Sequence, residues 1–337
     1  MPSFLKVIKT LRMLLKRVNF PKYSSKYSSK IFDNHQHIIL QVFRQKMKLP
    51  YRDFIEFLKA SKIPTWLNLK RIPHFTSPHK FLMRFTPSFI EWLISRCCSM
   101  LGLDNVFVGI DSTGFSLIKG SHHYCKRIKR KFRKKDFIKY SGIADLNNGL
   151  ILATRIRKKK RHDTKDFKSL LRRARRQTRI KVIAGDKGYD DEKNHEFARE
   201  KIGAESIIPL RNEKVSVWRT HGKYRKQLKR EFPKKKYNKR ARKESVISVV
   251  KRKYGSVLYS VKFKTQKNEV LFKVLGYNVD VINKVKDIFW LIFQRVSTEL
   301  RGISIPDLSR NHHFSICKGS ISTRIFSRYL KYRQEAY

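Results

Sequence analysis

The order of strand-like and helical segments between residues 104 and 255 limits the fold of this chain more than any other feature of its sequence. An apolar run of β-formers, NVFVGIDST, is followed by two strand-like runs joined by Asn147, Asn148 and Gly149, a strong hairpin signal. Helical and buried-strand patterns then alternate to the end of the region. Three strands that can pair antiparallel, followed by alternating helices and strands, predict an α/β fold with a mixed sheet and flanking helices.

The segment before residue 104 is typical of helices. An amphipathic start is followed by a polar linker, and apolar spacing from about residue 35 indicates several short helices. Ser77 and Pro78 are predicted to be the N-cap and the first residue of one of them. This helical module could contain a helix-turn-helix that binds DNA, or it could be a plain helical cap. The expected division is an N-terminal helix and linker over 1–34, a helical module over 35–103, an α/β domain over 104–280 and a C-terminal segment of unknown role over 281–337.

The charge of the chain points to a polyanionic partner. The sequence has 79 Lys and Arg against 26 Asp and Glu, a formal net charge of +53. A compact protein of that charge repels itself strongly, and nucleic acid is the first candidate to neutralise it. A membrane surface is a weaker candidate, because the positive charge runs through the whole chain and is not confined to one amphipathic segment.

The remaining composition fits a protein of the cytoplasm, associated with the nucleoid. No stretch approaches the length of uncharged apolar sequence that a membrane-spanning helix needs, and the first twenty residues lack the uninterrupted apolar core of a signal peptide. The four cysteines show no metal-ligand spacing, which suits a reducing compartment. Trp218 and Trp290 are expected in the core.

Two of the few acids close apolar strand runs. Asp111 ends the first run and Asp186 ends a later one, IKVIAGD, and sites in open sheets form at the carboxyl ends of strands. Either aspartate alone could merely cap the next turn, but both together predict a functional site. Other aspartates are predicted to cap helices: Asp163, Asp190 and Asp191.

A basic helix carries one isolated acid. In YNKRARKESVISVVKRKYG, helical geometry places four polar residues within a sector of roughly 60°, namely Tyr237, Arg240, Glu244 and Lys251. The opposite side is apolar and consists of Val246, Ile247, Val249 and Val250. A solvated charged face would scatter its acids, so the single glutamate is predicted to have a function.

Phosphodiester cleavage gives these residues a role. Two divalent ions can activate the attacking oxygen and stabilise the leaving one, and they need carboxylates from different elements. Mg²⁺ prefers oxygen ligands and completes its shell with phosphate and water. We therefore predict that Asp111, Asp186 and Glu244 are the catalytic residues and hold two Mg²⁺ or Mn²⁺ ions. Arg240 and Lys251 would contact the DNA backbone, with Tyr237 stacking or hydrogen bonding beside it.

Three blocks resemble DDE transposases of the IS4/IS5 type of prokaryotic insertion sequence. They are GIDSTGFS, IAGDKGYDD and YNKRARKESVISVVK, and the third has the form Y-x2-R-x3-E-x6-K, the YREK signature of that group. The resemblance spans about residues 105–255 and extends more loosely to 40–85. It implies an RNase H-like catalytic domain that cleaves DNA at terminal inverted repeats and joins the ends to target DNA. It also implies Mg²⁺ or Mn²⁺ as cofactor and a homodimer or larger synaptic assembly.

Two other functions stay open at this point. A domesticated or degenerate transposase would bind DNA without cutting it. An RNA-binding protein of ribosomal type would explain the charge, but not acids at two strand ends and one on a basic helix. For DNA binding, basic residues near the site are expected to contact phosphates, namely Lys126, Arg127, Arg130 and Lys187.

Overall fold

A computed structural model describes residues 3–117, 127, 137–158 and 162–301, with the backbone alone for 241–245 and 292–301. The chain divides into two compact units, Met1–Lys286 and Asp287–Tyr337. The fold that follows is that of the first unit. Of the second, the described part is the end of helix α13 (Phe263–Arg301).

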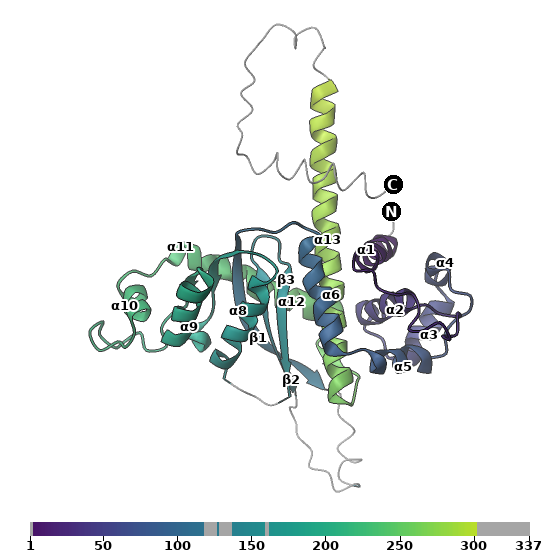
Figure 1. The fold of residues 1–337 in the computed structure, drawn as a ribbon, viewed down its shortest axis with the longest axis horizontal. Helices are drawn as coiled ribbons and strands as arrows, with labels where there is room; N and C mark the ends of the chain where they lie inside the picture. The colour runs from purple at the N-terminus through teal and green to yellow at the C-terminus, as the bar shows by residue number, and fades with distance from the viewer. Residues whose placement is uncertain (1–2, 118–126, 128–136, 159–161, 302–337) are drawn as a thin grey trace. The chain divides into compact units, whose positions relative to one another are not determined.

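A mixed six-stranded sheet forms the centre of the first unit (Figure 1). The strand order is β3-β2-β1-β4-β5, with β6 also paired to β1; β2 pairs antiparallel with β1 and β3, and β1 is parallel to β4 and β6. The strands are β1 (Val106–Leu117), β2 (Phe137–Asp145), β3 (Ile151–Arg157), β4 (Ile180–Ala184), β5 (Glu205–Ile207) and β6 (Val257–Leu258). This arrangement confirms the predicted α/β, RNase H-like class with a mixed sheet and flanking helices.

Two helices cover opposite faces of the sheet. Ser112 of β1 contacts Asp163, directly before α8 (Thr164–Arg175), whereas the next residue, Thr113, contacts Lys251 of α12 (Ala241–Tyr254). Successive residues of a strand point to opposite faces, so α8 and α12 lie on different sides. Both bury the apolar faces that their spacing predicts, namely Phe167, Leu170, Leu171 and Ala174 of α8 and Val246, Ile247 and Val250 of α12.

Short elements complete the α/β part of the chain. The turn Lys187–Tyr189 follows β4, α9 (Glu192–Glu196) continues into a π-helical turn over Phe197–Ile202, and β5 comes next. A basic segment then contains α10 (Lys223–Arg230), α11 (Lys234–Tyr237) and the turn Asn238–Arg240 before α12. The predicted succession of helices and strands after the hairpin is therefore present.

The predicted N-terminal helices are present, and Figure 1 shows α1 to α5 gathered in one group. One predicted start was wrong: α5 begins at Thr76, so Ser77 lies inside the helix and does not cap it. The cap-and-proline pair occurs at α6 instead, where Thr86 accepts a hydrogen bond from Phe89 N and Pro87 is the first residue. The helices are α1 (Ser3–Arg17), α2 (Asn34–Met47), α3 (Tyr51–Lys59), α4 (Ile63–Leu67), α5 (Thr76–Arg84) and α6 (Pro87–Ser99).

One continuous hydrophobic core joins the N-terminal helices, the sheet and the first part of α13. Helix α6 packs on β3, and α12 packs on both β1 and α2. Residues such as Val270, Leu271 and Phe272 of α13 are fully buried within this core. Within the described ranges, no helix is both long and apolar enough to cross a membrane.

Candidate active site

Asp111 and Asp186 occupy equivalent positions on neighbouring parallel strands. Asp186 follows the end of β4, but β1 does not end at Asp111 as predicted, because pairing with β2 and β6 continues it to Leu117. The last paired residues of β1 and β4 are Gly109 and Ala184, so the two aspartates follow them at the same distance along each strand. Both are half-buried. Asp111 Oδ1 accepts a hydrogen bond from Ser112 N (2.7 Å), and Asp186 Oδ1 accepts one from Gly188 N (2.9 Å). Asp186 therefore caps the next turn, and its position beside Asp111 is compatible with a second role.

A third carboxylate, that of Asp163, belongs to the same region. Its Oδ1 accepts a hydrogen bond from Ser112 Oγ (2.9 Å) and forms an ion pair with Lys139 Nζ (2.5 Å). A Cβ atom built on Gly188 would lie 2.9 Å from Asp186 Oδ1 and 3.1 Å from Asp163 Oδ2, so the two carboxylates border the same small space. Asp163 does precede α8 as predicted, but it makes no capping hydrogen bond. The sequence did not reveal that Asp163 lies near the other two aspartates, because an aspartate directly before a helix is usually interpreted as a helix cap.

The buried phenol of Tyr189 lies close enough to these carboxylates to be affected by their charge. The side chain is fully buried and packs on Phe167, with ring centroids 6.2 Å apart. Its hydroxyl oxygen makes no hydrogen bond with any described residue. Burial raises the pKa of Tyr189 well above its usual range, and the nearby charges of Asp163, Asp111 and Asp186 raise it further. Ser112 opposes part of this rise, although no hydrogen bond of normal geometry joins it to the phenol.

Helix α12 brings basic residues to the edge of the site. Lys251 Nζ donates to Thr113 Oγ1 (2.6 Å); burial lowers the pKa of Lys251, and the charge of Asp111 opposes that shift. Arg240 Nη1 donates to Tyr237 Oη (3.0 Å) just before the helix. Glu244 lies on α12 about two turns before Lys251 and on the same face of its backbone, and its side chain is outside the described part.

Of the other four residues predicted to contact DNA, two are exposed and two lie outside the described residues. Lys187 is exposed beside Asp186 and forms an ion pair with Glu213 (2.7 Å). Arg127 is exposed. Lys126 and Arg130 lie outside the described residues.

Both tryptophans were expected in the core, and the structure places both of them at the surface. Trp218 is 73% exposed and Trp290 is 48% exposed. Trp218 instead stacks against the neighbouring Arg219, whose guanidinium carbon lies 4.5 Å from the indole centroid.

The loop that carries Asp186 is fastened by the segment between β5 and α12. Asp190 accepts hydrogen bonds from Arg225 Nε and Nη2, both at 2.9 Å, and from Arg211 N (2.9 Å). Burial alone would raise the pKa of Asp190, but hydrogen bonds from His195 and Arg225 outweigh it and lower the value to about 2. Asp190 is thus an ion-pair partner and not the predicted helix cap, whereas Asp191 does cap α9 through Lys193 N (3.0 Å).

The donor chemistry of the site fits divalent cations. Carboxylate oxygens are the ligands that Mg²⁺ and Mn²⁺ prefer. Among the side chains that the structure describes, no three from His, Cys, Asp or Glu are arranged to hold one metal ion. A pair of carboxylates per ion, with phosphate and water in the remaining positions, matches how Mg²⁺ is usually bound.

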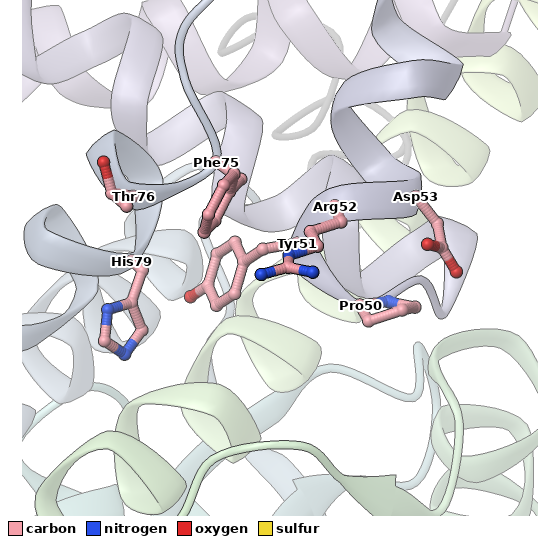
Figure 2. A pocket seen from close by; sticks show the side chains of 7 residues that line it. All are labelled: Pro50, Tyr51, Arg52, Asp53, Phe75, Thr76 and His79. Atoms are coloured by element: carbon pink, nitrogen blue, oxygen red, sulfur yellow. The ribbon is translucent and has the colours of Figure 1, made fainter.

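A separate surface pocket lies on the N-terminal helices (Figure 2). It has a volume of about 370 Å³ and is lined by the first residues of α3 and α5, and it shares no residue with the carboxylate site. Arg52 stacks on Phe75 at 4.9 Å from the ring centroid, and Tyr51 meets His79 edge-on with centroids 5.5 Å apart.

Comparison with known proteins identifies a family for this chain. Residues 103–279 match the model of the family described as transposase DDE domain, whereas no curated protein matches the sequence. Among solved structures, the chain is similar to the cryo-EM structure of a piggyBac transposase synaptic complex with hairpin DNA. The identity is 9% and the TM-score 0.45, covering 82% of this chain and 72% of that chain. The family match covers more than half of the present chain, and the protein therefore belongs to the transposase DDE domain family.

Proposed function

We propose that this protein is an IS4/IS5-type DNA transposase that binds the terminal inverted repeats of its insertion sequence, cleaves the ends and joins them to target DNA. One observation carries the proposal: Asp111 and Asp186 each lie two residues beyond the last paired residues of β1 and β4, and Lys251 of α12 is close to Asp111. The net charge of +53 supports a DNA partner.

The proposal assigns a role to each of these residues. Asp111, Asp186 and Glu244 would hold two Mg²⁺ or Mn²⁺ ions, which when bound activate the attacking oxygen and stabilise the leaving one. Hydrogen bonds from Ser112 N and Gly188 N keep one oxygen of each aspartate in a fixed orientation before DNA arrives.

Basic residues complete the proposed site. Lys251 and Arg240 supply positive charge for phosphates beside the scissile bond, and Tyr237 positions Arg240. Lys187, Arg127, Lys126 and Arg130 would contact more distant phosphates. Residues 35–103 would bind the DNA ends, and a homodimer would hold two ends together.

The experiment uses isosteric carboxylate variants. The flanking DNA of the gene is searched for short inverted repeats, which then serve as the cleavage substrate with Mg²⁺ or with a chelator. Asp111→Asn, Asp186→Asn and Glu244→Gln should each abolish Mg²⁺-dependent cleavage and leave binding to the repeats largely intact. Asp191→Asn, which keeps a helix cap outside the site, is the control. Cleavage that survives Glu244→Gln would overturn the assignment.

A further inference from the structure

The two oxygens of Asp163 have different surroundings. Oδ1 is held by Ser112 Oγ and Lys139 Nζ. Oδ2 takes part in none of the hydrogen bonds found among the described residues, and it borders the same point near Gly188 as Asp186 Oδ1. One oxygen of Asp163 is therefore fixed by the protein, and the other borders the same small space as the Asp186 carboxylate.

This arrangement concentrates negative charge. Asp163 and Asp186 border the same point near Gly188, whereas strand alternation directs Asp111 toward the α12 face, and Ser112 links the two sides by donating its N to Asp111 and its Oγ to Asp163. Carboxylates that share a small space repel one another unless a cation lies between them. Lys139, whose side chain is 11% exposed, is the cation paired with Asp163 among the described residues.

Tyr189 is an independent sign that something binds here. Its side chain is fully buried, yet its hydroxyl has no hydrogen-bond partner within the described residues. An unsatisfied buried hydroxyl is costly, and such groups are uncommon unless a ligand or water completes them. The charges of Asp163, Asp111 and Asp186 all act on this phenol and raise its pKa, which places it near the carboxylates.

We propose that Asp163 is a fourth carboxylate of the active site, which binds a divalent cation jointly with Asp186, while the Tyr189 hydroxyl donates a hydrogen bond to the ligands of that cation. The inference rests on the proposed function, because it adds a ligand to the same site. Lys139 then has a defined part: it neutralises Asp163 before the cation binds and competes with the cation for that carboxylate.

The test measures binding of Mn²⁺ alone to the full-length, chelator-treated protein, by calorimetry and by the electron paramagnetic resonance signal of free Mn²⁺. Asp163→Asn should weaken the affinity for Mn²⁺ by about tenfold or more, the range found when partners of a metal site are lost. Lys139→Gln removes the competing cation and should raise the affinity by a factor of about two to five. Asp191→Asn is the matched control and should bind Mn²⁺ as the wild type does.

The two variants should change the Mn²⁺ affinity in opposite directions, and this distinguishes a metal-binding role of Asp163 from a purely structural ion pair. If Asp163 only anchors Lys139, both variants lose stability together, and Asp163→Asn binds Mn²⁺ with wild-type affinity, which overturns the inference. If Asp163→Asn fails to fold, Lys139→Gln still decides, because an unchanged or lower Mn²⁺ affinity also overturns it. Failure of the proposed function looks different: Asp111→Asn and Asp186→Asn would then leave Mn²⁺ binding unchanged.

Discussion

At the scale of single residues, Tyr189 offers the sharpest test of whether the carboxylate site awaits a ligand. Tyr189→Phe removes a hydroxyl that has no partner in the metal-free protein. Its free energy of unfolding should therefore stay within about 1 kcal/mol of the wild type in chelator. Single-turnover cleavage with Mg²⁺ should fall by about tenfold, because a donor to the ligand shell is lost. A destabilisation clearly above 1 kcal/mol would show that the hydroxyl has a partner in the folded protein.

The aspartates show what single residues reveal before the fold is known. Asp111 and Asp186 were predicted as site residues because each closes an apolar run in the sequence. The pairing of β1 with β4 places them at equivalent positions, although β1 continues beyond Asp111. Asp163 could not be found in this way. Its contacts, Ser112 and Lys139, lie on two other strands, and a carboxylate before a helix has a sufficient local explanation as a cap.

At the scale of elements, periodicity and turn chemistry were reliable where the signal is local. The hairpin at Asn147–Gly149 formed as predicted, with Gly149 at φ 80° and the Asp145 carboxylate accepting hydrogen bonds from Asn147 N and Asn148 N. The start of α5 was wrong because Thr76 extends the helix before Ser77. Trp218 was misplaced because burial depends on neighbours that are distant in sequence, which composition does not reveal.

The clamp between Asp190 and Arg225 joins two elements that local patterns did not connect, and it makes a prediction for acid stability. The pKa of Asp190 is lowered from its ordinary value of 3.8 to about 2. A carboxylate with a lowered pKa in the folded state stabilises the protein above its unfolded pKa, and this contribution is lost as the pH falls through the folded one. Urea midpoints of the wild type should therefore decrease between about pH 4 and pH 2 partly through this residue.

Asp190→Asn tests that assignment directly. The variant should be less stable than the wild type at pH 6, because Arg225 loses its charged partner, and the difference should shrink toward pH 2. Asp191→Asn, one residue away, keeps its capping role and should follow the wild-type curve. A stability difference between Asp190→Asn and the wild type that stays constant over this range would refute the assigned role of the clamp.

At the scale of the whole molecule, a buried ion pair joins the N-terminal helices to the segments that follow the sheet. Arg44 of α2 forms an ion pair with Glu269 of α13 at 3.5 Å, and both side chains are almost completely buried. Glu269 also accepts hydrogen bonds from Tyr259 N and Ser260 N, directly after β6. Glu269 therefore connects α13 to the N-terminal helices and to the segment after β6, inside one continuous core.

The charge of the whole chain predicts steep salt dependence of DNA binding, and the exposed pair of Lys187 and Glu213 allows a test with two opposite variants. The logarithm of the association constant for duplex DNA should fall linearly with the logarithm of salt concentration. Lys187→Gln should reduce that slope by about 1, since one phosphate contact is lost. Glu213→Gln removes the competing carboxylate and should strengthen binding at low salt. Fluorescence anisotropy across a salt series measures both effects; if neither variant changes the slope or the affinity, Lys187 does not contact DNA.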